Sequence, residues 1–146
     1  MRGVTLLELV IVITVVGILA AVAIPRVSMS PAGLDAAARK VQSDLLYAQS
    51  LAMGRGVNHG ILFVANAPYV LYQGVPASPI SDPLTHQNFS ENLIRFSRSR
   101  VTTNLQVEFD PIGRPVQGGG ATLTVANGAL SRLISITNGT GRVLIQ

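Results

Sequence analysis

The chain has 146 residues, a length that suits one globular domain with an appendage rather than several domains. Hydrophobic residues make up 48% and charged residues 12%, and a net charge of +4 is too small to indicate nucleic-acid binding by itself. Because the chain has no cysteine, disulfide bonds and thiolate metal sites are excluded.

The first predicted element is an apolar segment at residues 4–24, in which Glu8 is the one charged side chain. As a helix this segment would extend about 32 Å, close to the ~30 Å hydrocarbon thickness of a bilayer. It is longer than the apolar part of an ordinary secretory signal, and no small-residue cleavage site follows before Pro25. A carboxylate inside a membrane helix costs about 2.5–3.5 kcal/mol, so we expect Glu8 to have a partner.

A specific motif overlaps this apolar segment. Residues 3–8 read Gly-Val-Thr-Leu-Leu-Glu, residues 17–21 read Gly-Ile-Leu-Ala-Ala, and Pro25 follows. The pattern resembles the N-terminal signature of type IV prepilins and pseudopilins. The resemblance implies that a prepilin peptidase cuts between Gly3 and Val4 and methylates the new N-terminus. The family usually has Phe where this chain has Val4.

The resemblance also implies roles for Glu8 and Pro25. After cleavage, the new α-amino group of a neighbouring subunit would neutralise the Glu8 carboxylate in the filament and set the axial stagger of the subunits. The simpler alternative is a tolerated Glu near the helix end that snorkels to the interface. Pro25 would bend the helix between its membrane half and its globular half, because proline removes a backbone donor.

Residues 26–56 predict an amphipathic continuation of the helix. Ser30 followed by Pro31 is typical of a helix start, and Gly54 and Gly56 are typical of a helix end. Apolar residues recur at spacings of three and four, which places them on one helical face. That face consists of Leu34, Ala38, Val41, Leu45, Ala48 and Ala52.

Residues 57–146 predict a β-rich globular domain. Short β-like runs occur at residues 58–65, 69–73, 93–96, 105–109, 121–125, 130–137 and 142–145. The Asn127-Gly128 pair favours a tight hairpin, and residues 74–90, with three prolines, predict a long surface loop. The whole pattern predicts an α+β fold, in which one long helix packs on antiparallel β-sheets.

Later segments narrow the resemblance. Residues 44–50, followed by Met53-Gly54-Arg55, are similar to the second helix of the GspH/FimT group of minor pilins and pseudopilins. Residues 109–115, 122–124 and 139–143 are similar to the C-terminal half of that group. The resemblance implies a pilin-like fold and a structural role.

Enzymatic chemistry has little support in the sequence. His59 and His86 have no cysteine partners and no His-Glu-x-x-His spacing, so we expect ordinary surface or strand positions for them. Residues 118–120, three glycines, lack the Lys and Ser/Thr of a phosphate-binding loop and are better explained as a flexible hairpin connection. We therefore expect a non-enzymatic protein with no cofactor and no metal.

One basic cluster raises an alternative function. Arg95, Arg98 and Arg100 surround Phe96, an arrangement that could hold phosphates and stack a base. In a strand, Arg98 and Arg100 would share one face while Arg95 points to the other. Arg142 partly matches a pattern found in members of the subgroup that serve DNA uptake. The simpler interpretation is a solvated edge whose charges discourage aggregation between sheets.

The sequence thus predicts a prepilin leader at residues 1–3, a transmembrane and filament-core helix at 4–25, its amphipathic continuation at 26–56, and the β-rich domain at 57–146. We expect a minor pilin or pseudopilin that helps initiate or cap a type II secretion pseudopilus or a type IV pilus. Its expected partners are other subunits, the prepilin peptidase and the inner membrane, with the C-terminal domain in the periplasm. The alternatives are a DNA-binding minor pilin and a membrane-anchored domain outside any filament system.

Overall fold

The computed structural model describes residues 5–23, 31–83 and 85–146. The chain divides into two units, Met1–Ser30 and Pro31–Gln146, and each is described by itself. Within the described ranges, no helix combines the length and the apolar character that crossing a membrane requires. Whether the helix is continuous through residues 24–30, as the sequence predicts, lies outside the described residues.

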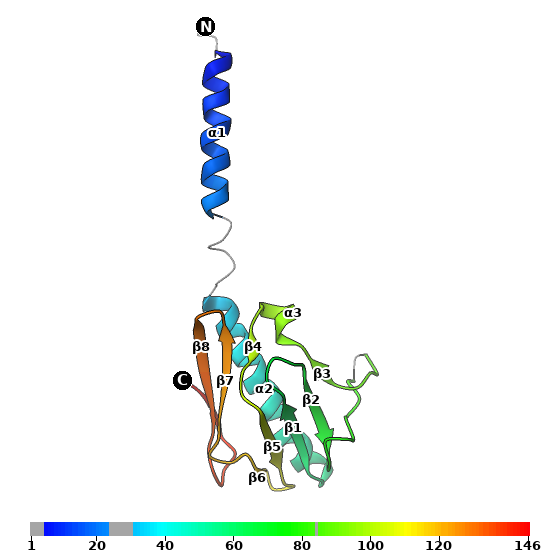
Figure 1. The fold of residues 1–146 in the computed structure, drawn as a ribbon. Helices are drawn as coiled ribbons and strands as arrows, with labels where there is room; N and C mark the ends of the chain where they lie inside the picture. Colours follow the sequence, from blue (N-terminus) through cyan, green and yellow to red (C-terminus); the bar gives the residue numbers. More distant parts are fainter. Residues whose placement is uncertain (1–4, 24–30, 84) are drawn as a thin grey trace. The chain divides into compact units, whose positions relative to one another are not determined.

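The described part of the first unit is the helix α1 (Leu6–Ala23), preceded by Thr5 (Figure 1). The Thr5 hydroxyl accepts a hydrogen bond from the Glu8 N–H at 3.3 Å, as an N-cap residue does. Residues 10–16 are all β-branched, a composition that lowers helix propensity in water. The Thr14 hydroxyl donates a hydrogen bond to the Val10 carbonyl at 2.7 Å, so this polar group has a partner within the apolar helix.

The second unit is built around the helix α2 (Pro31–Arg55). The apolar face predicted from the sequence is the buried one, and Ala37 and Asp44 are also buried on it. The helix ends where Gly56 adopts a φ of 67° and donates its N–H to the Ala52 carbonyl at 3.0 Å. That left-handed conformation is the common way in which glycine ends a helix.

Two antiparallel sheets pack on α2, which contacts strands of both. The first sheet has the order β3-β2-β1-β5-β6 and the second has the order β4-β7-β8-β9 (Figure 1). The first sheet comprises β1 (His59–Phe63), β2 (Tyr69–Gln73), β3 (Ser90–Glu91), β5 (Leu105–Phe109) and β6 (Pro115–Gln117). The second comprises β4 (Arg100–Val101), β7 (Thr122–Asn127), β8 (Leu130–Ile136) and β9 (Val143–Ile145).

The hydrophobic core lies between α2 and the inner faces of the two sheets. Every core residue that the structure describes belongs to the second unit, and its larger sheet residues include Phe63, Tyr69, Phe109, Leu123, Ile134 and Ile136. The predicted α+β fold, a helix on antiparallel sheets, is therefore confirmed. Because the described residues of this core all lie within residues 31–146, these residues contain the interactions that hold the unit together.

One predicted strand is wrong. Residues 93–96 belong to a short helix, α3 (Leu93–Ser97), and not to a strand. Asn92 caps this helix by accepting a hydrogen bond from the Ile94 N–H at 3.0 Å, while Leu93 is buried in the core. The N-cap thus outweighs the strand preference of the residues that follow it.

The turns agree with the sequence at one site and differ at another. Asn127 pairs with Leu130, so the β7–β8 connection is a tight hairpin with Gly128 at a φ of 62°. The three glycines at residues 118–120 do not form a hairpin, because they connect β6 of one sheet to β7 of the other. A Cβ at Gly118 would lie 2.5 Å from the Gln106 carbonyl oxygen, so this crossover requires glycine.

Candidate functional site

The first candidate surface is α1. Its large apolar side chains from Leu6 to Leu19 are all exposed within this chain, from 47% at Val10 to 82% at Leu6. They surround the helix, so α1 has no polar face to turn toward water. A helix that is apolar all round is normally buried in a membrane or in a protein core. The described residues of α1 therefore form a helix whose apolar surface would normally be covered by other apolar groups.

Glu8 is the exception on this apolar surface. It lies in the first turn of α1, where a negative charge is favoured by the helix dipole. The side chain is exposed, and no basic side chain in the described part of the chain pairs with it. The carboxylate is therefore available to a cation from another molecule. The other predicted residues of this region, Gly3, Val4 and Pro25, lie outside the described residues.

The predicted basic cluster is only partly assembled. Arg95 lies in α3, Arg98 ends that helix at a φ of 57°, and Arg100 is in β4. All three side chains are exposed. The expected strand alternation of Arg98 and Arg100 is wrong, because Arg98 is a helix C-cap in the left-handed conformation. The three arginines still lie within one short stretch of surface.

Arg142 does not join them. It follows the turn at Thr140. The Thr140 carbonyl accepts a hydrogen bond at 3.2 Å from the side chain of Gln49, which lies in the C-terminal half of α2. In contrast, α3 lies beside the first turn of α2, because a Cβ added at Gly33 would be 3.5 Å from the Ser97 carbonyl oxygen. Arg142 thus lies near the C-terminal half of α2, whereas α3 lies at the end of the second unit where α2 begins.

A buried ion-pair network fastens α2 to the first sheet. Asp44 is only 6% exposed, and both of its oxygens lie 2.8 Å from the Lys40 Nζ. The Tyr69 hydroxyl of β2 donates to the same carboxylate, and Lys40 also lies 3.3 Å from Glu91 of β3. The Lys40 ammonium lies 5.6 Å from the centre of the Phe89 ring, a cation–π contact. The network explains how a carboxylate is tolerated inside this core.

Burial is the largest single influence on the pKa values of Asp44, Tyr69 and Lys40 in this network. It raises the pKa of the Asp44 carboxyl, and the hydrogen bonds from Lys40 and Tyr69 offset this effect only in part. Burial and the neighbouring Asp44 carboxylate also raise the pKa of the Tyr69 hydroxyl far above its usual value. For Lys40, burial acts to lower the pKa, but Asp44 and Glu91 outweigh it, so its pKa is raised. These groups hold the fold together and show no arrangement for catalysis.

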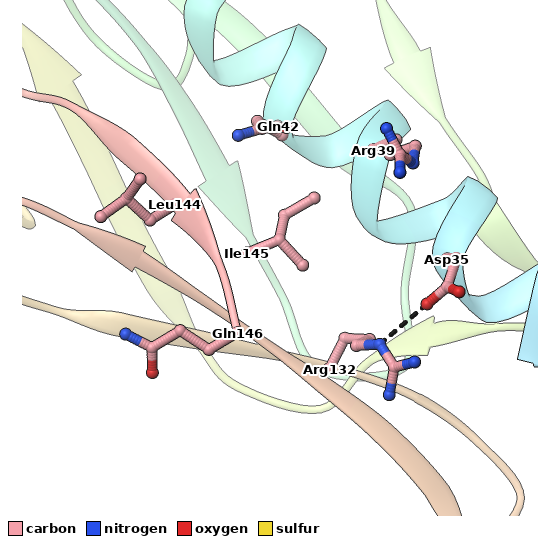
Figure 2. Close-up of a pocket in the computed structure, with 7 residues that line it drawn as sticks. All are labelled: Asp35, Arg39, Gln42, Arg132, Leu144, Ile145 and Gln146. Atoms are coloured by element: carbon pink, nitrogen blue, oxygen red, sulfur yellow. Dashed lines mark hydrogen bonds and ion pairs between the residues drawn. The ribbon is translucent and has the colours of Figure 1, made fainter.

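A groove between α2 and the second sheet is a second candidate contact surface (Figure 2). It has a volume of about 660 Å³, and its lining residues are Asp35, Arg39, Gln42, Arg132, Leu144, Ile145 and Gln146. The Arg132 Nε donates to Asp35 at 2.8 Å, whereas Arg39 has no carboxylate partner in the parts of the chain that the structure describes. The groove can therefore accept one additional anionic group beside an apolar wall.

The two histidines occupy ordinary positions. His59 begins β1 and is fully buried, with Nδ1 2.8 Å from the Val57 carbonyl oxygen. Its Nε2 has no hydrogen-bond partner, and no acidic residue accompanies it in a metal-binding group among the described residues. His86 lies exposed in the long loop at a φ of 55°. Within the part of the chain that the structure describes, neither histidine belongs to a group of side chains that could hold a metal ion.

Sequence reasoning missed the groove and most of the ion-pair network. Lys40 and Asp44 are four positions apart on a helix, a spacing that indicates a pair and that could have been recognised. In contrast, 97 positions separate Asp35 from Arg132, and no local pattern indicates that they meet.

Comparison with known proteins relates the whole chain to one group. The chain is 31% identical to the pilin-like protein PilA1 of Thermus thermophilus in an alignment of 146 positions, which covers 93% of this chain and 93% of PilA1. No family model matches the chain.

The fold is similar to that of the type IV minor pilin FimU of Pseudomonas aeruginosa in two crystal forms. The TM-scores are 0.55 and 0.60 at 18% identity, and the similarity covers 77% of this chain. It covers 92% and 87% of the FimU chains. At this identity the similarity shows a shared fold.

Proposed function

Because this chain belongs to the type IV pilin-like proteins, we propose that it is a minor structural subunit that helps initiate or cap a filament. The filament is a type IV pilus or a type II secretion pseudopilus. The subunit works by packing against other pilin subunits, and no catalytic step is involved.

The observation that carries this proposal is the surface of α1. The helix exposes apolar side chains on every side and a single carboxylate, Glu8, near its start. Apolar surface is stabilised by roughly 25 cal/mol for each Å² removed from water, so a bundle of such helices is strongly favoured. Inside that bundle, Glu8 is stable only beside a positive charge, and we assign that charge to the processed α-amino group of a neighbouring subunit.

We further propose that the precursor is held in the inner membrane with its second unit in the periplasm. The support comes from the sequence, in which residues 4–24 are apolar apart from Glu8. The prepilin peptidase would cut between Gly3 and Val4, and Pro25 would allow the helix to bend. The parts proposed from the sequence are the leader at 1–3, the core helix at 4–25, the continuation at 26–56 and the globular domain at 57–146.

The test combines processing and assembly. We expect the intact mass of the membrane-extracted protein to lack residues 1–3, and the Gly3→Ala variant to retain them. The Glu8→Gln variant keeps the shape of the side chain but loses its charge, so it should be processed normally and yet fail to co-purify with sheared filaments. A wild-type chain that retains residues 1–3 would contradict the proposal and would favour a membrane-anchored domain outside any filament system.

The DNA-uptake alternative receives less support from the geometry. Arg95, Arg98 and Arg100 lie together, but Arg142 is at the other end of the unit. A DNA-binding face would need these charges along one path of the phosphate backbone. Salt-sensitive binding that requires all four arginines would support the alternative.

A further inference from the structure

The end of the second unit at which α2 begins carries a mixed apolar and basic surface. We call it the basal surface and define it by Ile94, Arg95, Phe96, Arg98 and Arg100. Ile94 and Phe96 are 49% and 59% exposed, although each is a large apolar side chain. The three arginines between and beside them are also exposed.

The basal surface is held in a fixed shape. Leu93 anchors α3 in the core at 4% exposure, and Asn92 caps its first turn. At the other end of α3, the Arg98 N–H donates to the Ile94 carbonyl at 3.1 Å. The Asn127 side chain also donates to the Ser97 carbonyl at 3.3 Å. Because these bonds position the backbone, the apolar side chains are exposed by the fold itself.

The positive charge of the basal surface is not neutralised by nearby carboxylates. Among the described residues, none forms an ion pair with its three arginines. Glu91, two residues before α3, is paired with Lys40 at 3.3 Å, and Asp35 is paired with Arg132 at 2.8 Å. The surface therefore attracts anions. An exposed aliphatic side chain such as Ile94 adds little to nucleic-acid binding, whereas exposed aliphatic and aromatic side chains both suit the interface of an anionic membrane.

The length of the connecting chain limits how far this surface can lie from the end of α1. The basal surface lies beside Gly33, in the first turn of α2. Residues 24–30 join that turn to α1, and a segment of this length reaches at most about 25 Å when fully extended. This limit holds for every arrangement of the two units. A membrane that contains α1 is therefore always within reach of the basal surface, at a high effective concentration.

We propose that the basal surface docks on the anionic phospholipid headgroups of the membrane that holds the precursor. Ile94 and Phe96 enter the interface, and the three arginines contact lipid phosphates. Docking would hold the globular unit against the membrane until a growing filament extracts the subunit. This inference rests on the proposed function, because α1 supplies the anchor.

The experiment uses the full chain in liposomes that contain brominated phospholipids, which quench indole fluorescence. The chain has no tryptophan, so Phe96→Trp introduces a single reporter in the basal surface. The control is Ile112→Trp, because Ile112 is 65% exposed and lies beside Gly113, which faces Met53 near the far end of α2. We expect quenching of the Phe96→Trp reporter that grows with the fraction of anionic lipid, and little quenching of the control. Equal quenching at both positions, or no dependence on lipid charge, would overturn the proposal.

Charge variants provide a matched comparison in the same liposomes. Arg95→Gln with Arg100→Gln should lower the ratio of docked to undocked protein by roughly fivefold for each arginine. Arg55→Gln with Arg114→Gln makes the same charge change at the opposite end of the unit and should leave the ratio unchanged. Similar losses in both pairs would show a general effect of net charge and would overturn the assigned surface.

Flotation of the liposomes separates the possible failures. A chain that floats with the liposomes but shows no quenching of the Phe96→Trp reporter contradicts docking alone. A chain that does not float contradicts both docking and the proposed membrane-held precursor. Binding of a DNA duplex through Arg95 and Arg100, without quenching by anionic lipid, would instead assign the surface to nucleic acid.

Discussion

Replacing Asp44 by Ala should destabilise the second unit much more than replacing Asp35 by Ala on the same helix. Without Asp44, the buried Tyr69 hydroxyl loses its acceptor, which costs about 1–3 kcal/mol. The lost ion pair adds at most ~1 kcal/mol, because the Lys40 side chain is 33% exposed and keeps Glu91 as a partner. The expected loss is therefore about 1–4 kcal/mol, or roughly 4–16 °C in the melting temperature of a domain of this size.

Asp35 gives the matched control. Its ion pair with Arg132 joins side chains that are 46% and 37% exposed, so Asp35→Ala should cost less than about 1 kcal/mol. Asp44→Asn keeps an acceptor for the Tyr69 hydroxyl and should recover part of the loss. Thermal unfolding of residues 31–146, which contain the whole core, can be followed by far-ultraviolet circular dichroism. Equal shifts for Asp44→Ala and Asp35→Ala would refute the role given to the buried network.

Two further predictions concern other buried groups. Burial raises the pKa values of the Tyr69 and Tyr72 hydroxyls, so the unfolded chain loses these protons at a lower pH than the folded chain does. The free energy of unfolding should therefore fall as the pH rises above about 10. Equal denaturant midpoints at pH 8 and pH 11 would contradict this expectation. A Cβ at Gly60 would lie 2.5 Å from the Val107 carbonyl oxygen, so Gly60→Ala should destabilise the second unit by about 1–3 kcal/mol. Gly54→Ala should stabilise it slightly, because Gly54 lies in the open end of α2, where alanine favours the helix. Equal melting temperatures for the two variants would refute this prediction.

The fold was largely predictable because its longer elements have clear periodicity. The buried face of α2 follows from apolar residues at spacings of three and four, and β2 and β5 have the bounds predicted for them. The strands β3, β4 and β6 were missed because two or three residues cannot show alternation. These strands form only because longer neighbours provide hydrogen-bond partners for them.

The candidate surfaces were less predictable than the fold. The apolar character of α1 and the isolated charge of Glu8 are visible in the sequence. The basal surface was not predicted as such, because Ile94 and Phe96 have the apolar character of core strand residues. Their exposure results from the cap at Asn92, which turns this stretch into a helix with only Leu93 buried.

The position of α2 also has a mechanical consequence. A force transmitted along the chain enters the second unit at Pro31, the first residue of the helix on which both sheets pack. The load therefore falls first on α2, and its contacts with the two sheets must slide or break before the sheets come apart. The Gln42 and Gln49 side chains, which bond to the Val143 and Gly113 carbonyls, resist the same sliding motion. A subunit loaded in this way should unfold slowly under tension, a property that would suit the filament role proposed above.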